Sequence, residues 1–274
     1  MARDLKISKL LSHITACRTA TLPGERLPFY IGADQVGYVK PDFAARLAAC
    51  PDISVTDKVV LAVSAAPRLN EIAKGAGSRI RFEDFDVRAV VDGPVLAVLD
   101  RGALPDFGVI GVGAHLNGLV QKPDGWHLWV AKRAADKKLD PGKLDHLVAG
   151  GVSVGMTPFE TLVKEAGEEA GLPEDLASQA KFVCQLHYNM ERPEGLRRDV
   201  LYAYDCVLPD QFHPEPADGE VESFELWPLE RVFERVCSSD DFKFNVNLVL
   251  IDLFIRFALV TGADAALLRA ALNF

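Results

Sequence analysis

The chain has 274 residues and a formal net charge of −9, with 49% hydrophobic and 25% charged residues. This balance is typical of a globular protein, and the length favours two domains over one. The acidic charge disfavours nucleic acid as a partner, because a phosphate backbone is held mainly by clustered Lys and Arg. It does not exclude a small diphosphate, whose charge a bound metal and a few local cations can offset.

The cysteines and the apolar segments indicate which kind of globular protein this is. The five cysteines are widely spaced and contain no Cys-x-x-Cys pair, which predicts free thiols rather than disulfides or a zinc site. Residues 1–17 lack the apolar run of a signal peptide, and Asp252 and Arg256 interrupt the most apolar stretch, residues 248–260. We therefore expect a cytoplasmic protein without a membrane span.

Residues 1–107 carry the signals of a small α+β domain. Gly102 to Gly108, with Pro105 between them, is the expected junction to a second domain of residues 108–274. In chain order the periodicity predicts a helix and an irregular lead-in (1–27), a hairpin (29–31 with 36–39), a helix (42–50), a strand (59–64), a short helix (69–74) and a strand (95–100).

The second domain begins with longer strands. Residues 112–121 and 126–133 flank Lys122-Pro123-Asp124-Gly125, a turn signal that predicts a hairpin. After the helix discussed next, the expected elements are strands (182–188 and 200–207), a short helix (229–236), a strongly apolar helix (246–257) and a final helix (265–271).

One short helix, after Gly150 and before Gly171, carries Glu165, Glu168 and Glu169 on one side. Three carboxylates at this spacing repel one another, and Mg²⁺ or Mn²⁺, which prefer hard oxygen ligands, would neutralise them. The helix boundaries are predicted by a Thr157–Glu160 capping box, by Pro158 at the first helical position and by Gly171. A solvated acidic face is the alternative interpretation, and the spacing favours a metal site.

This spacing resembles the box of the Nudix hydrolase family, G-x5-E-x7-R-E-U-x-E-E-x-G-U with U aliphatic. The glycines, the three ligand glutamates and the final aliphatic residue agree: Gly150, Glu165, Glu168, Glu169, Gly171 and Leu172. Three positions depart, because Met156 replaces the first glutamate, Lys164 replaces the arginine and Ala166 is a small aliphatic residue. In the family the first glutamate and the arginine brace the helix and loop, so the hypothesis is that Met156 and Lys164 weaken one contact. Lysine lacks the planar fork of arginine.

Further stretches resemble one Nudix branch with an extra N-terminal domain, which includes the Nudix part of fungal thiamine pyrophosphokinase fusions and their stand-alone relatives. These stretches are residues 113–120, 128–151, 218–232 and 247–257. The resemblance implies an α/β/α sandwich with a mixed sheet and a metal held by Gly150, Glu165, Glu168 and Glu169. It also implies hydrolysis of oxidised thiamine diphosphate derivatives to the monophosphate and phosphate. The alternative substrate is ADP-ribose, and the alternative function is a catalytically weakened ligand-binding module. A homodimer is a further possibility.

The other candidate residues have weaker signals. Glu220 and Glu222 can assist the metal site, as a glutamate from a distant loop does in some relatives, or form a solvated turn. His115 and Asn117 face one side of a strand and are substrate contacts or core residues. A cleft at the domain junction would have Arg101 on its rim. The basic residues before the box are Lys132, Arg133, Lys137 and Lys138, which meet a diphosphate or form a solvated loop.

Overall fold

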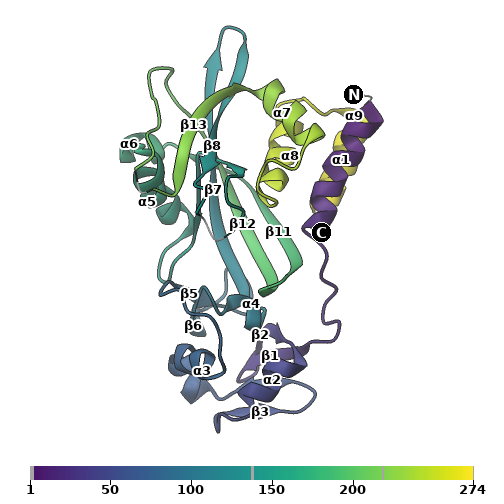
Figure 1. The fold of residues 1–274 in the computed structure, drawn as a ribbon, viewed down its shortest axis with the longest axis vertical. Helices are drawn as coiled ribbons and strands as arrows, with labels where there is room; N and C mark the ends of the chain where they lie inside the picture. The colour runs from purple at the N-terminus through teal and green to yellow at the C-terminus, as the bar shows by residue number, and fades with distance from the viewer. Residues whose placement is uncertain (1–2, 137–138, 218, 274) are drawn as a thin grey trace.

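The computed structural model describes residues 3–136, 139–217 and 219–273, which form two lobes (Figure 1). We call residues 27–109 the small lobe and the remainder the large lobe. Each lobe has its own apolar core, and the large lobe has one on each face of its sheet. Among the helices of the described residues, none is long and apolar enough to cross a membrane.

The small lobe is built on a four-stranded sheet with the order β2-β1-β4-β3 and a separate ribbon, β5 with β6. Its core centres on Phe107, whose ring lies 5.1 Å from those of Phe29 and Phe43. The elements are β1 (Leu27–Ile31), β2 (Asp34–Val39), α2 (Pro41–Leu47), β3 (Ile53–Val55), β4 (Val59–Leu61), the 3₁₀ helix η1 (Val63–Arg68), α3 (Leu69–Gly75), β5 (Asp84–Val87), β6 (Ala97–Asp100) and α4 (Leu104–Phe107).

Most of the elements expected in the small lobe are present. The predicted hairpin, both helices and the strand near residue 100 are confirmed. The strand expected at residues 59–64 ends at Leu61, because residues 63–68 form the 3₁₀ helix η1 instead. The short strands β3 and β5 were not predicted.

The large lobe is built on a seven-stranded mixed sheet. Its main order is β11-β12-β7-β8-β13, with β10 paired to β7 and β9 paired to β8. The β12–β7 pair is parallel and the others are antiparallel, and the predicted β7–β8 hairpin is confirmed. The strands are β7 (Ile110–Lys122), β8 (Gly125–Arg133), β9 (Leu144–Asp145), β10 (Val148–Gly151), β11 (Lys181–Arg192), β12 (Gly195–Val207) and β13 (Val221–Pro228).

Helices cover both faces of this sheet (Figure 1). Side chains alternate along β7, so Ala114 and Leu116 face α5 (Pro158–Ala170) and α6 (Glu174–Ala177), whereas Leu119 faces the core of α7 (Leu229–Ser238) and α8 (Val246–Arg256). The expected α/β/α sandwich with an α+β region before it is confirmed.

Helix α5 has the boundaries that its sequence predicts. Glu160 N–H donates to Thr157 Oγ1 at 3.2 Å, and Thr157 N–H donates to Glu160 Oε2 at 2.8 Å, which completes the capping box. Gly171 ends the helix with φ +60°, a conformation that glycine adopts without strain. The ends of the glutamate helix are therefore determined locally.

Helix α1 (Arg3–Ala16) belongs to the core of the large lobe, although the chain then continues into the small lobe. It lies against α7, α8 and α9 (Gly262–Leu272), and Arg3 Nε lies 2.6 Å from Asp264 Oδ2 (Figure 1). The division into domains of residues 1–107 and 108–274 stays a prediction.

The packing of α1 gives a first testable prediction. Leu10 is fully buried in the helix layer, whereas Leu5 on the same helix is 59% exposed. Leu10→Ala should lower the free energy of unfolding by about 2–5 kcal/mol, and Leu5→Ala by less than about 0.5 kcal/mol. Denaturant titration of both variants measures the difference, and equal small losses would contradict the packing of α1 on the large lobe.

Candidate active site

Strand β10 and helix α5 meet at Gly150, where there is no room for a side chain. A Cβ at this position would lie 2.6 Å from Cγ and 2.9 Å from Cδ of Glu165, below any normal contact distance. The Glu165 carboxyl therefore lies directly on the backbone of β10. Burial raises its pKa, and the charge of Glu168 adds to this effect while Lys164 opposes it.

Glu169 approaches the same strand one turn along the helix. Its Oε2 accepts a 3.1 Å hydrogen bond from Ala149 N–H, and the side chain is buried. Burial raises the pKa of Glu169 to about 8, against the effect of that hydrogen bond, and the charges of Glu165, Asp145 and Glu220 raise it further. Several carboxylates thus share a confined space.

Glu168 is more exposed and turns toward Lys164. Lys164 Nζ lies 2.9 Å from Glu168 Oε2 and 3.5 Å from Glu165 Oε1, and both carboxylates raise the pKa of this amine. Within the described ranges, the three glutamates are not gathered closely enough to share one ion at these side-chain positions. The amine of Lys164 therefore neutralises part of the negative charge that a metal ion was predicted to neutralise.

The donor chemistry beside Gly150 nevertheless suits a divalent cation. Glu165 and Glu169 bring hard carboxylate oxygens to the β10 backbone, and like charges around Glu169 make its ionised form costly without a counter-charge. Gly150 also lines the cavity beside these carboxylates. The residues present therefore fit Mg²⁺ or Mn²⁺.

A cavity of about 340 Å³ opens between the two lobes and has Ala149, Gly150 and Gly151 in its wall. The small lobe reaches it through β5, because a Cβ on Gly151 would lie 2.6 Å from Cζ of Phe85 and Val154 N–H donates to Asp84 O at 2.8 Å. Its charged lining comes from both lobes: Arg79, Arg81, Arg101, Asp106, Glu194, Arg197, Asp199 and Lys243.

The sequence candidates for substrate contact separate into two groups. Arg101 and His115 line the cavity. Asn117 is fully buried, and its Nδ2 donates to Asp205 Oδ1 at 2.8 Å, so its position does not support the expected contact with substrate. Arg133 Nη1 lies 2.8 Å from Asp145 Oδ2, and its other nitrogens bond backbone carbonyls, which favours a structural role.

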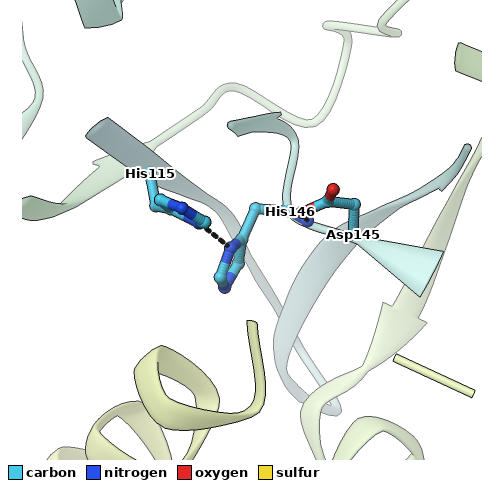
Figure 2. A group of neighbouring side chains, drawn as sticks. All are labelled: His115, Asp145 and His146. Atoms are coloured by element: carbon cyan, nitrogen blue, oxygen red, sulfur yellow. Dashed lines mark hydrogen bonds between the residues drawn. The ribbon is translucent and has the colours of Figure 1, made fainter. Parts of the chain in front are cut away.

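His115 forms a buried cluster with Asp145 and His146 (Figure 2). The two histidines share a 2.9 Å hydrogen bond between their Nδ1 atoms, and His146 N–H donates to Asp145 Oδ1. Each of these three side chains offers one atom that could bind a metal, and the three atoms lie within 4.8 Å of one another. Among the described residues, this is the group of His, Cys, Asp or Glu side chains that is close enough to share one ion.

Electrostatics argue against a metal in this cluster. Arg133 and Lys243 lie 2.8 and 3.3 Å from Asp145, and they hold the pKa of its carboxyl below the ordinary value although burial alone would raise it. Burial lowers the pKa of His146 to about 4 and that of His115 well below 6.5, so both rings are neutral. Two cations already balance the one carboxylate, and a third would be repelled.

The two acidic candidates differ in position, because Glu220 precedes β13 and Glu222 lies in it. Glu220 lines a small pocket with Glu169 and Ala149, and its charge acts on both Glu165 and Glu169. Glu222 instead forms a 2.7 Å ion pair with Lys132 and is half exposed. Lys137 and Lys138 of the basic cluster lie outside the described residues.

The two departures from the box lie in separate surroundings. Met156 lines a second cavity of about 270 Å³ with Phe85 and Tyr202, whereas Lys164 bonds the helix glutamates. Sequence reasoning did not select Arg79, Arg81 or Lys243. No local pattern could have selected them, because Lys243 and the segment of Arg79 and Arg81 are far apart in the sequence and meet only at the cavity.

Comparison with known proteins gives consistent matches. Residues 116–244 match the NUDIX domain family. The chain is 36% identical over 255 residues to "Nudix hydrolase 20, chloroplastic" of Arabidopsis thaliana, covering 85% of this chain and 68% of that protein. "Nudix hydrolase 24, chloroplastic" of the same plant is also 36% identical, over 86% and 69% of the two chains. The NUDIX domain of Shewanella oneidensis NrtR, solved with ADP ribose, has 13% identity and a TM-score of 0.44 over 56% of this chain and 91% of that one.

The close contact at Gly150 predicts the effect of a single methyl group. Gly150→Ala forces Glu165 or β10 to shift, so it should lower the free energy of unfolding by about 1–3 kcal/mol and weaken Mn²⁺ binding. Gly167→Ala on the same helix meets nothing closer than 4.0 Å and should be neutral or stabilising by up to about 1 kcal/mol. Calorimetric titration and denaturation test the pair, and equal effects would contradict the geometry.

The neutral histidine pair predicts a pH dependence of stability. The unfolded chain takes up protons near the ordinary histidine pKa of 6.5, whereas folded His146 does so only near 4. The free energy of unfolding should therefore be highest above pH 6.5 and fall as the pH drops toward 4, by up to about 1.4 kcal/mol per pH unit for each histidine.

Denaturation of the parent and of His146→Asn between pH 7.5 and 5 isolates this contribution, because all other titrating groups are shared. The variant should lose part of the slope. Identical slopes would show that the pKa of His146 is not lowered in the folded protein.

Proposed function

The chain belongs to the Nudix family, and from this membership and the site at Gly150 we propose a metal-dependent hydrolase that cleaves a diphosphate linkage in a small molecule. One observation carries the proposal: the Glu165 side chain packs directly on Gly150, and Gly150 lines a cavity that five cationic side chains also line. This arrangement combines oxygen ligands for a metal with positive charge for phosphate oxygens.

Each residue of the site has a proposed role. The Gly150 carbonyl and the carboxylates of Glu165, Glu168 and Glu169 would hold Mg²⁺ or Mn²⁺, with Lys164 released from Glu168 toward solvent. When bound, the cation supplies charge neutralisation at the diphosphate and lowers the pKa of a water ligand. The Ala149 N–H orients Glu169 by a bond that does not depend on the metal.

Glu220 is proposed as the assisting acidic residue. It lies beside Ala149 and Glu169 and interacts electrostatically with Glu165. Its carboxylate can therefore accept a proton close to the proposed metal site. Glu222 is less suited, because its carboxylate pairs with Lys132 on the exposed side of β13. The coupled carboxylates of this site titrate together, so the proton belongs to the group rather than to one member.

For the substrate we propose oxidised thiamine diphosphate derivatives, cleaved to the monophosphate and phosphate. The support is the resemblance to the thiamine-related branch together with a cavity whose second wall is the small lobe, where one lobe can read the organic group while the other holds the diphosphate. ADP-ribose is the alternative substrate, and the assay below includes it.

A binding module without turnover is the second candidate function. The specific observation is the position of Lys164, whose amine lies 2.9 Å from Glu168 and 3.5 Å from Glu165 and so competes with a metal for both. Met156 in place of the first box glutamate points the same way. Measured hydrolysis distinguishes the two functions.

The assay compares metal-dependent release of phosphate by the parent, Glu165→Gln, Glu169→Gln and the control Glu174→Gln. Glutamine at 169 still accepts the Ala149 hydrogen bond but carries no charge, so the fold should persist while kcat falls by about 10²-fold or more. The exposed Glu174 lies on α6, away from the cavity, and its substitution should change nothing.

Oxidised thiamine diphosphate and ADP-ribose, each with Mg²⁺ or Mn²⁺, are the substrates. Parent-like turnover in both box variants would overturn the site assignment. Binding of either compound without any turnover by the parent would support the binding module instead.

A further inference from the structure

The charge in the cavity is the opposite of the charge on the whole protein. Five cationic and three acidic side chains line it, in a chain with a net charge of −9. The cations come from both lobes: Arg197 and Lys243 from the large lobe, and Arg79, Arg81 and Arg101 from the small lobe. Such a local excess in an acidic protein requires its own explanation.

Two of the three acidic residues of the cavity form ion pairs with arginines of the large lobe. Asp199 accepts bonds from Arg197 Nε and Nη2 at 2.9 and 2.8 Å, and Glu194 lies 3.7 Å from Arg192. Burial raises the pKa of Asp106, and the charge of Arg46 opposes this shift. Asp199 therefore balances Arg197, whereas among the described residues no acidic residue of the cavity lining forms an ion pair with Arg79, Arg81 or Arg101.

Two arginines of the small lobe have no such partner. Across residues 3–136, 139–217 and 219–273, the side chains of Arg79 and Arg81 form no hydrogen bond and no ion pair. The nearby Glu83 forms an ion pair with Arg101 instead, whose Nη1 lies 3.0 and 2.9 Å from the two carboxylate oxygens. Burial lowers the pKa of Arg81, and repulsion by Arg101, Arg79 and Arg197 lowers it further.

The turn that carries these arginines is rigidly built. The buried carboxylate of Asp100 accepts hydrogen bonds from the backbone N–H groups of Arg81 and Phe82 at 2.8 and 2.6 Å, and from that of Gly102 at 2.7 Å. Phe82 adopts φ +61°, a strained conformation for a residue with a side chain. A buried acid thus holds a strained turn so that cationic side chains face a cavity.

We propose that Arg79, Arg81 and Arg101 form an anion-binding subsite, contributed by the small lobe, that binds a phosphate group of the substrate in the cavity that Gly150 also lines. The proposal rests on the diphosphate chemistry proposed above and assigns part of substrate binding to residues outside the Nudix match, which begins at residue 116. A guanidinium fork matches the geometry of phosphate oxygens and is preorganised for two parallel hydrogen bonds.

The lobe contacts show why this subsite would act together with the metal-binding strand. Phe85 follows Arg81 by four residues and packs on Gly151, and Asp84 O accepts the 2.8 Å bond from Val154 N–H. These contacts fix the position of the segment that carries Arg79 and Arg81 relative to Gly150. A phosphate group bound by the turn would arrive at the metal ligands in a fixed position.

The test measures binding of inorganic pyrophosphate to the full chain in EDTA at low salt, by calorimetry, and KM and kcat on the hydrolysed diphosphate. In Arg79→Ala/Arg81→Ala, pyrophosphate affinity should fall at least tenfold, and KM should rise at least tenfold with a smaller change in kcat. Arg81→Lys keeps the charge without the fork and should be intermediate. Lys74→Ala removes an exposed cation of the same lobe that does not line the cavity and should change affinity less than twofold.

The outcomes separate the subsite from the proposed activity. Loss of pyrophosphate binding in the double variant, with no diphosphate hydrolysed by the parent, supports the subsite and rejects the activity. Hydrolysis by the parent with unchanged pyrophosphate binding in the double variant rejects the subsite and keeps the activity. A parent that does not bind pyrophosphate in EDTA overturns the subsite, and equal loss in Lys74→Ala reduces it to a nonspecific charge effect.

Discussion

The close packing of two glycines in β10 is the constraint on which the site depends. On one side of the strand, the Glu165 carboxyl occupies the space that a Cβ on Gly150 would need, and on the other side the Phe85 ring does the same at Gly151. Helix α5 and the small lobe are thereby held against the same two residues. A protein interior packs too densely to absorb even one additional methyl group there without a shift.

The sequence predicted those parts of the molecule whose signals are local. The capping box of Thr157 and Glu160 and the final Gly171 set the bounds of α5, and the turn at Lys122 to Gly125 predicted the β7–β8 hairpin. Strand β10 was not predicted, because two of its four residues are glycines, which have low strand propensity, and its register depends on β7.

The candidate site shows the same division between local and distant effects. Helical spacing predicted that Glu165 and Glu169 would lie on one side, but it could not predict that Lys164 would draw Glu168 away. His115 and Arg133 were both candidates for contact with the ligand, yet only the fold shows that Arg133 neutralises the buried Asp145. Burial and pairing between distant residues decide these roles, and a single sequence records neither.

The position of α1 has a consequence for how the protein is made. Arg3 and Asp264 are paired across 261 residues of chain, and Leu10 is buried among helices that begin after residue 228. Contacts at such sequence separation form late, because the intervening chain must first be ordered. During synthesis, the small lobe can assemble from residues 27–109 while α1 waits with an uncovered apolar face until α7, α8 and α9 emerge. That interval, rather than any property of the finished protein, is when α1 most needs protection from aggregation.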